Sequence, residues 1–372
     1  MLEIFVSFSV LFGVFTLAVN YFNNYRKERG FEYQNVWAVN FGIPPGISNK
    51  DTVNMMISSL RNMISAIPDV ENISFSSGNI PYSANTYNSM VNYEKKELMT
   101  HIYVADRNYL DVLGLKMESG NWEGSLRNST RTKGVVLNTT LKEALFGNAN
   151  PVGKTLKLGD EQLEVRGVVK DFKNFGDYQA VENGIIKVLD TVDASQQWMI
   201  LLKVKQGANA ASEARLYKTV SNFSKNANVE IEHLSKKRTS KNKLTLIPML
   251  ILFIVSAFLI VNVALGIFGV LWYNINKRRA EIGLRRAIGA STTAIAWQIS
   301  GEAMVLSTIS LLAGTFFAVQ FPLLNVFDLP SNVYFAAIFL SVMFIYSLVL
   351  ICSLYPAKQA SAIYPAVALH EE

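Results

Sequence analysis

Four long apolar stretches divide the chain, and the polar segment between the first two holds most of the charged residues. Each stretch reaches the roughly 18 residues that a helix needs to cross the hydrocarbon core of a bilayer. The stretches are residues 4–22, 244–273, 294–324 and 333–355. The pattern therefore predicts a membrane protein with four transmembrane α-helices and one large domain inserted between the first and second.

The polar segment shows both the spacing of helices and that of strands. Residues 51–67 repeat at helical spacing and stop at Pro68-Asp69, whereas residues 35–41, 70–75 and 97–106 are rich in strand-forming residues. The expected apolar helix face is Val53, Met56, Ile57, Leu60, Met63, Ile64 and Ile67. A second part has helices at 139–147 and 211–223, a hairpin at 154–158 and 162–172, and a strand at 198–205. This order predicts an α+β domain.

We accordingly divide the chain into a transmembrane helix, the α+β domain, a second transmembrane helix, a loop helix, two further transmembrane helices and a tail. In that order the segments are residues 1–22, 23–243, 244–273, 274–292, 293–355 and 356–372. The first apolar run could be a signal peptide or a membrane anchor. A signal peptide has a basic start and a small-x-small cleavage site. Its start, Met1-Leu2-Glu3, and its length favour a membrane anchor, and a basic cytosolic segment is expected to precede it in the full protein.

The segment FGNANPVGKTL, residues 146–156, ends like a nucleotide-binding P-loop. A P-loop has four residues between its first Gly and its Gly-Lys-Thr and then opens a helix. Here five residues separate Gly147 from Gly153, and the residues after Lys154 predict a hairpin. We therefore interpret the segment as a helix end, with Gly147 as the C-cap, followed by a turn into a strand.

Catalytic or metal-binding chemistry has little support in the sequence. Cys352 is the only cysteine, and the three histidines, at 101, 233 and 370, are far apart. No Cys/His spacing of a metal site, no nucleophile motif and no reason to pair two carboxylates is present. The net charge of +6 is dispersed along the chain, which does not indicate nucleic-acid binding. We expect a non-enzymatic chain with no cofactor of its own.

The charge of the short loop after the second span predicts the orientation in the membrane, because cytosolic loops are rich in Lys and Arg. This loop carries one acid, Glu281, against Lys277, Arg278, Arg279, Arg285 and Arg286. The flanks of the α+β domain are also basic and argue for the opposite orientation, but long domains cross membranes largely regardless of charge. We therefore expect both termini in the cytosol and the α+β domain to be extracytoplasmic.

Residues 277–291 predict a short amphipathic helix. Leu284, Ala287 and Ile288 can share a face, and Glu281 can pair with Arg285 one turn later. Gly289 is a candidate C-cap, and Ser291 can cap the next span. Two interpretations remain open: a basic helix on the membrane surface, or a docking helix for a cytosolic partner.

At this loop the sequence resembles the permease family of MacB, LolC, LolE and FtsX. Residues 278–291, RRAEIGLRRAIGAS, together with Gln298, Glu302 and Ala303, are similar to the family's loop and its continuation. The tail at 356–369 and the segments 109–122, 146–158 and 164–172 resemble further family motifs. The resemblance covers nearly the whole chain, and the loop and the tail are its most specific parts.

The resemblance implies an ABC transporter permease in the bacterial inner membrane, with its MacB-like core domain in the periplasm. Such permeases pair as dimers, with themselves or with a paralogue, and bind a separate cytosolic ATPase that holds the ATP. Hydrolysis would drive motion of the periplasmic domain, for efflux or for mechanical work. The implied coupling residues are Arg278, Arg279, Glu281, Ile282, Leu284, Arg285, Arg286 and Ile288. Membrane lipid and a periplasmic adaptor are further expected partners; the alternative is an FtsX-like membrane-anchored regulator or sensor without transport.

Two smaller hypotheses concern polar and small residues of the spans. Glu302 lies one turn after Gln298 near the expected cytosolic boundary, where it would brace the loop rather than relay protons. Ser9 and Gly13 form a small-xxx-small pair, and Asn262 could hydrogen-bond across helices. These three residues are candidates for a dimer interface, although packing within one subunit is nearly as good an explanation.

Overall fold

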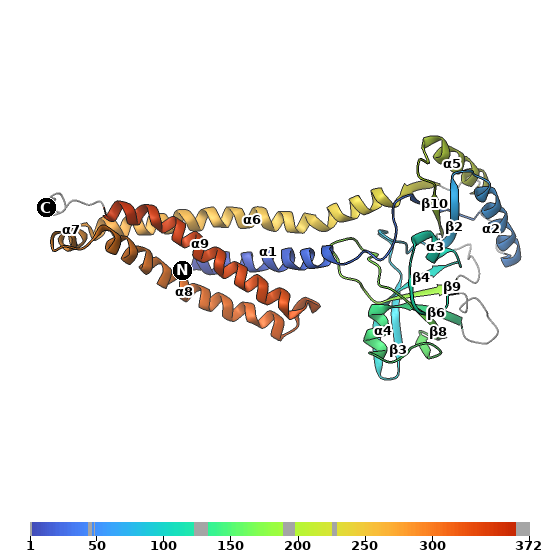
Figure 1. Cartoon of the computed structure of the whole chain (residues 1–372), viewed down its shortest axis with the longest axis horizontal. Coiled ribbons are helices and arrows are strands. Elements are labelled where there is room, and N and C mark those ends of the chain that lie inside the picture. Colours follow the sequence, from blue (N-terminus) through green and yellow to red (C-terminus); the bar gives the residue numbers. More distant parts are fainter. Residues whose placement is uncertain are drawn as a thin grey trace. The chain divides into compact units, whose positions relative to one another are not determined.

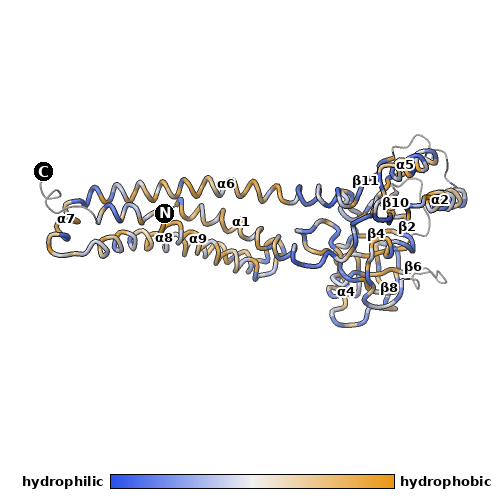
Figure 2. The backbone as a smooth tube through the Cα atoms, turned by 45° about the horizontal axis from the view of Figure 1, so that its top comes forward, coloured by the Kyte–Doolittle hydropathy of each residue, from blue (hydrophilic) through white to orange (hydrophobic). Residues whose placement is uncertain are grey.

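The structure is a computed structural model that describes residues 2–43, 47, 49–122, 133–188, 198–224 and 229–361. The chain forms two compact units. One combines Met1–Asn23 with Leu246–Glu372, and the other comprises Asn24–Thr245. The first holds the apolar stretches, which Figure 2 shows as orange along α1, α6, α8 and α9.

Four helices in the described residues are long and apolar enough to cross a membrane. They are α1 (Leu2–Arg26), α6 (Leu234–Lys277), α8 (Thr292–Leu323) and α9 (Ser331–Ser361). The short helix α7 (Arg279–Ala287) follows α6, and a turn of 3-10 helix at Val326–Asp328 joins α8 to α9. Their shared core includes Phe8, Ile299, Tyr334 and Ile345. Phe8 packs against Gly314, where a β-carbon would lie 2.4 Å from the ring.

Two helices extend beyond the predicted spans. Helix α6 begins at Leu234 instead of 244, because residues 234–243 contain no Gly or Pro and hydropathy marks only the part in lipid. Helix α9 continues to Ser361 through Pro356, so 356–361 are not the tail that the sequence suggested. Ala357 and Ala360 are buried and hold this last turn against the bundle. Residues 362–372 of the expected tail lie outside the described residues.

The second unit is built on one network of hydrogen-bonded strands in two parts (Figure 1). A four-stranded antiparallel sheet has the order β11-β1-β10-β2. Strands β4, β3, β7, β8, β6 and β9 pair in turn, and a parallel β4–β9 pairing closes the ring. The closed pairing leaves no free edge in this ring, and β5 adds to β8.

The eleven strands of the described residues are mostly short. Their bounds are β1 Val36–Phe41, β2 Val70–Ser77, β3 Asn88–Tyr93, β4 Lys96–Ala105, β5 Met117–Gly120, β6 Lys133–Asn138, β7 Thr155–Leu158, β8 Glu161–Val169, β9 Gly184–Val188, β10 Trp198–Val204 and β11 Glu230–His233. The sequence did not predict β3, β5, β6, β9 and β11. These strands are held by partners from distant parts of the chain, which a local sequence pattern does not reveal.

Alternation along the strands separates the cores of this unit. In β1, Trp37, Val39 and Phe41 face helices α2 (Lys50–Ser65) and α5 (Ala210–Ser224). Val36 and Ala38 belong to a second core with α3 (Tyr109–Leu113). Helix α4 (Thr139–Phe146) buries Leu141 and Leu145 in the core of the closed ring. The predicted α+β character of the domain agrees with this arrangement.

The FGNANPVGKTL segment does not form a P-loop. Helix α4 ends at Gly147, which has φ +58°, a conformation that suits glycine. After Pro151, the amide of Lys154 bonds the Pro151 carbonyl at 3.0 Å, and Thr155 opens a strand, not a helix. The predicted helix end and turn are confirmed.

Helix α2 offers a matched pair of core and surface positions for a stability test. Leu60 is fully buried against the sheet, whereas Met63, which the helical pattern placed on the same face, is 43% exposed. We expect Leu60→Ala to lower the free energy of unfolding by about 2–5 kcal/mol, through lost burial and a cavity. Met63→Ala should change it by less than about 0.5 kcal/mol.

The measurement is denaturant unfolding of the full chain in micelles, followed by tryptophan fluorescence. Three of the five tryptophans, Trp37, Trp122 and Trp198, are buried in this unit and report its unfolding. Equal effects of the two substitutions would contradict the assigned face of α2.

Candidate functional site

Among the polar networks of the described residues, two hold ends of the long helices, one in each unit. The first surrounds α7 and links it to α8. Arg278, at the break between α6 and α7, donates to Glu302 at 3.0 and 3.1 Å and to Glu281 at 3.1 Å. Arg285 donates to Glu281 and to Gln298, both at 2.6 Å. The expected Glu281–Arg285 pair is therefore present, and Glu302 contacts Arg278 at the start of α7; its bracing role stays a prediction.

The ends of α7 are fixed by local backbone bonds. Gly289 follows the helix with φ +105°, and the amide of Ala290 bonds the Arg285 carbonyl at 2.9 Å. The Ser291 hydroxyl accepts the amide of Ala294 at 3.2 Å and caps α8, as predicted. The direction of α7 relative to α8 is thus set by caps as well as by the charged network.

Of the three apolar residues expected to take part in coupling, Ile282 lies on a different side from Leu284 and Ile288. Ile282 is buried in the core of the helical unit. Leu284 and Ile288 are 54% and 79% exposed. The reason is geometric: at about 100° per residue, Ile282 and Leu284 are about 200° apart, whereas Leu284 and Ile288 nearly coincide. Only the latter two are available to a partner.

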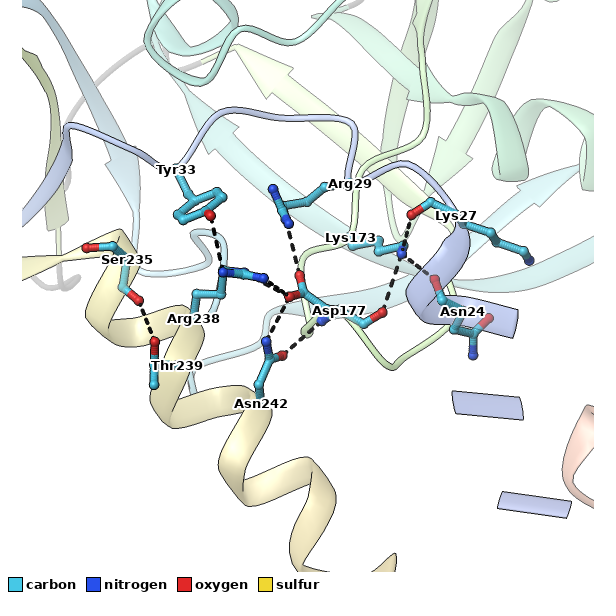
Figure 3. Close-up of polar contacts among 10 residues, drawn as sticks. All are labelled: Asn24, Lys27, Arg29, Tyr33, Lys173, Asp177, Ser235, Arg238, Thr239 and Asn242. Carbon is cyan, nitrogen blue, oxygen red and sulfur yellow. Dashed lines mark hydrogen bonds and ion pairs between the residues drawn. The ribbon is translucent and has the colours of Figure 1, made fainter. Parts of the chain in front are cut away.

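The second network centres on Asp177 in the other unit (Figure 3). Its carboxylate, 4% exposed, accepts Arg29 Nε at 3.2 Å, Arg238 Nε at 2.8 Å and Asn242 Nδ2 at 2.8 Å. The amide of Asp177 also bonds Asn242 Oδ1 at 3.0 Å. Three segments meet on one carboxylate: the chain after α1, the 173–177 segment and the first turns of α6. We call Arg29, Lys173, Asp177, Arg238 and Asn242 the Asp177 cluster.

Lys173 fastens the end of α1 from the same segment. Its buried ammonium donates to the carbonyls of Asn24, Lys27 and Asp177, the last at 3.3 Å. These carbonyls include the C-terminal end of α1, where a cation is favoured by the helix dipole. Burial lowers the pKa of the Lys173 ammonium below its ordinary range, although Asp177 opposes the effect. Lys173 therefore adds a charged donor at the end of α1, where the Asn24 carbonyl also accepts the amide of Lys27 at 3.1 Å.

Backbone and ring contacts complete the cluster. Gly30, at φ +82°, lets the chain after α1 pass so close to Asp171 that a β-carbon would lie 1.9 Å from the Asp171 carbonyl. The guanidinium groups of Arg29 and Arg238 both lie over the Tyr33 ring, at 4.5 and 4.7 Å from its centroid. Arg238 also donates to the Tyr33 hydroxyl at 3.1 Å. The two cations are held together by one carboxylate and one ring.

The carboxylate of Asp177 stays ionised despite its burial. Burial alone would raise its pKa, but the hydrogen bonds from Arg238, Asn242 and Arg29 outweigh burial, so the pKa lies below its ordinary value. Burial raises the pKa of the nearby Tyr82 phenol, and Asp177 adds to that shift. The cluster has the composition of a structural clamp, with no free base or nucleophile among its contacts.

The remaining candidate residues are not brought together by contacts within the chain. Ser9 is exposed and donates to the Phe5 carbonyl at 2.9 Å, and a β-carbon on Gly13 would have open space. Asn262 is exposed and donates to the Phe258 carbonyl at 2.8 Å. A dimer interface at these residues stays a prediction. Among the described residues, no three His, Cys, Asp or Glu side chains are grouped to hold a metal ion.

Comparison with known families agrees with this architecture. Residues 1–216 match the family described as the MacB-like periplasmic core domain. Residues 253–365 match the family described as the FtsX-like permease C-terminal domain. The chain therefore belongs to the MacB/FtsX family of ABC transporter permeases, which are transmembrane proteins with a periplasmic domain.

Individual relatives have low sequence identity. The macrolide export ATP-binding/permease protein MacB of Bdellovibrio bacteriovorus is 25% identical, over 85% of this chain and 49% of its own. The uncharacterized ABC transporter permease YvrN of Bacillus subtilis is 25% identical, over 73% of this chain and 70% of its own. The crystal structure of the periplasmic region of MacB from Actinobacillus actinomycetemcomitans is 19% identical, with a TM-score of 0.40, over 59% of this chain and 97% of that one. This chain spans about half the length of the MacB relatives that it matches.

Asp177→Asn tests the clamp. The substitution leaves the partly buried guanidinium groups of Arg29 and Arg238 together without a counter-charge. We expect the free energy of unfolding to fall by about 3 kcal/mol, the lower end of the range for broken buried ion pairs, since both arginines are partly exposed. The measurement is denaturant unfolding of the full chain at neutral pH.

The pH dependence distinguishes a charge effect from lost packing. Because the folded-state pKa of Asp177 is depressed, its ionised carboxylate stabilises the folded state fully above the ordinary pKa of 3.8. This contribution to the free energy of unfolding is lost as pH falls below that value. The difference in the free energy of unfolding between the wild type and Asp177→Asn should therefore shrink below pH 3.8. Asp160→Asn, on the exposed turn between β7 and β8, is the control and should match the wild type. A gap that is constant with pH would refute the ionic clamp.

Proposed function

We propose that this chain is the permease subunit of an ABC transporter that couples ATP hydrolysis by a separate ATPase to movement of its periplasmic domain. The observation that carries the proposal is the presentation of α7. Leu284 and Ile288 are exposed on a helix whose other side is buried through Ile282 and braced through Arg278 and Glu302. Such a helix can bind a groove on a partner without first becoming ordered, which lowers the entropic cost of docking.

The Asp177 cluster supports the second half of the proposal. Arg29 follows the end of α1, and Arg238 and Asn242 lie in the first turns of α6. All three side chains bind the carboxylate of Asp177 in the periplasmic domain. Both helices are continuous, α1 over 25 residues and α6 over 44. A displacement of either helix along its axis would therefore act on the 173–177 segment. We infer that this route carries motion from the ATPase to the periplasmic domain.

The expected partners follow from the same proposal. ATP would bind to the separate ATPase, and the MacB relatives, named ATP-binding/permease proteins, support an ATPase partner. A second permease, identical or paralogous, would complete the pair in the inner membrane. Ser9, Gly13 and Asn262 are the proposed contacts, and Ser9 and Asn262 are exposed. Export and mechanical work remain two possible outputs of the same motion.

Leu284→Ala and Ile288→Ala test the docking of α7. Each removes an apolar side chain that is exposed in the free chain and would be buried on docking. Apolar side chains buried at the centre of an interface dominate its energy. We expect each to weaken association with the ATPase by about 1–3 kcal/mol, which is roughly 5- to 150-fold in affinity. Copurification of the ATPase and stimulation of its activity are the readouts.

The control is Leu312→Ala, an exposed apolar position in α8 and away from α7. It should leave both readouts unchanged. Neutralising Arg279 or Arg286 should have a smaller effect that declines with salt, because charges at an interface rim act mainly through screened attraction. Full retention of both readouts by the Leu284→Ala/Ile288→Ala double variant would refute docking and favour a helix that only rests on lipid.

Glu302→Gln tests the brace. The amide cannot form the charge-assisted, two-oxygen contact with Arg278, so α7 should lose one of its fixings to α8. Because both side chains are about half exposed, the effect on stability should stay below about 1 kcal/mol. We expect association with the ATPase to be retained and stimulation of its activity to fall. Normal stimulation would rule out a role for the charge of Glu302.

A further inference from the structure

A concave groove lies on the periplasmic unit, on a different side of the first turns of α6 from the face that binds Asp177. Its volume is about 340 Å³, which is in the range of ligand sites. One wall is the face of α6 that carries Lys237, Lys241 and Leu244, at spacings of four and three residues. The opposite wall comes from the segment around Tyr82 and from β11.

The groove is positively charged. Lys236, Lys237 and Lys241 line it against one carboxylate, that of Glu232, which pairs with Lys237. Lys241 makes only a long 3.4 Å bond to the Ser83 carbonyl, and Lys236 is exposed with no ion pair among the described residues. Two ammonium groups therefore remain to attract an anion at this point, and Ser240 adds a hydroxyl donor to the lining.

The groove lining includes an exposed apolar residue, and this feature identifies the kind of anion. Leu244 lines the groove and is 63% exposed. It is also the first residue of the apolar stretch of α6, in which Ile251 recurs on the same side two turns later and is likewise exposed. A free phosphate would use only the lysines. A molecule with an anionic head and hydrocarbon chains would use both the lysines and the apolar side chains.

We propose that this groove binds the headgroup of an anionic phospholipid. The phosphate lies against Lys236 and Lys241, and the acyl chains follow the exposed apolar side of α6 from Leu244 onward. Juxtamembrane lysines attract anionic headgroups in this way, and the groove supplies a defined pocket in addition to the charge. The bound lipid would lie on the same helical turns of α6 that the Asp177 cluster holds.

The test measures lipid binding to the full chain in nanodiscs by native mass spectrometry, without an ATPase. Phosphatidylglycerol should be retained in preference to phosphatidylcholine. Lys236→Gln/Lys241→Gln should lower the affinity for phosphatidylglycerol by about 25-fold, or about five-fold for each lysine. Lys218→Gln, an exposed lysine on α5, is the matched control and should have no effect.

A second arm separates a lipid from a soluble anion. Inorganic phosphate at millimolar concentration should not displace phosphatidylglycerol, and Leu244→Ser should weaken lipid binding with both lysines intact. Displacement by phosphate together with normal binding by Leu244→Ser would show a soluble-anion site and overturn the proposal. Equal retention of the two lipids, or an unchanged double-lysine variant, would also overturn it. Neither result bears on docking of an ATPase, which is measured separately.

Discussion

The charge of Asp177 is the constraint on which the arrangement of this periplasmic unit depends. A carboxylate that is 4% exposed must be given several donors, since the cost of burying a lone charge far exceeds the cost of ordering a loop. No single segment here supplies enough of them. Arg29 comes from the chain after α1, and Arg238 and Asn242 come from α6. Satisfying one charge therefore fixes the positions of two helix ends.

The network around α7 follows a different rule. Its charged side chains are each between 41% and 45% exposed, so each pair contributes little and is weakened by water and salt. The Asp177 cluster is instead desolvated and has a full set of donors. A chain that transmits motion needs a firm attachment where work is delivered and an adjustable one where a partner binds. The two networks differ in that sense, which is consistent with the transmission proposed above.

The sequence pattern predicted those features of the structure that depend on residues close together in the chain. Hydropathy located the four spans, helical spacing located α2, and the i,i+4 rule paired Glu281 with Arg285. The separation of Ile282 from Leu284 was predictable too, because the angle per residue already places them on different sides of the helix. The Asp177 cluster could not have been found in this way. Its ion pairs join residues 148 and 61 positions apart, and Arg29 and Arg238 looked like ordinary basic flanks until the fold brought them together.

The first turns of α6 are occupied on two sides, and this limits how the helix can move. Arg238 and Asn242, one turn apart, hold one side to Asp177, while Lys237 and Lys241 line the groove about 100° away. Rotation of α6 about its axis would break the contacts of Arg238 and Asn242 with the buried Asp177 carboxylate. Bending is less costly, because Pro248 removes the hydrogen bond to the carbonyl of Leu244 and weakens the helix just beyond the clamp. Under the proposed coupling, the movement of α6 would therefore be tilt or translation, with Pro248 as the point of flexure and the Asp177 cluster intact.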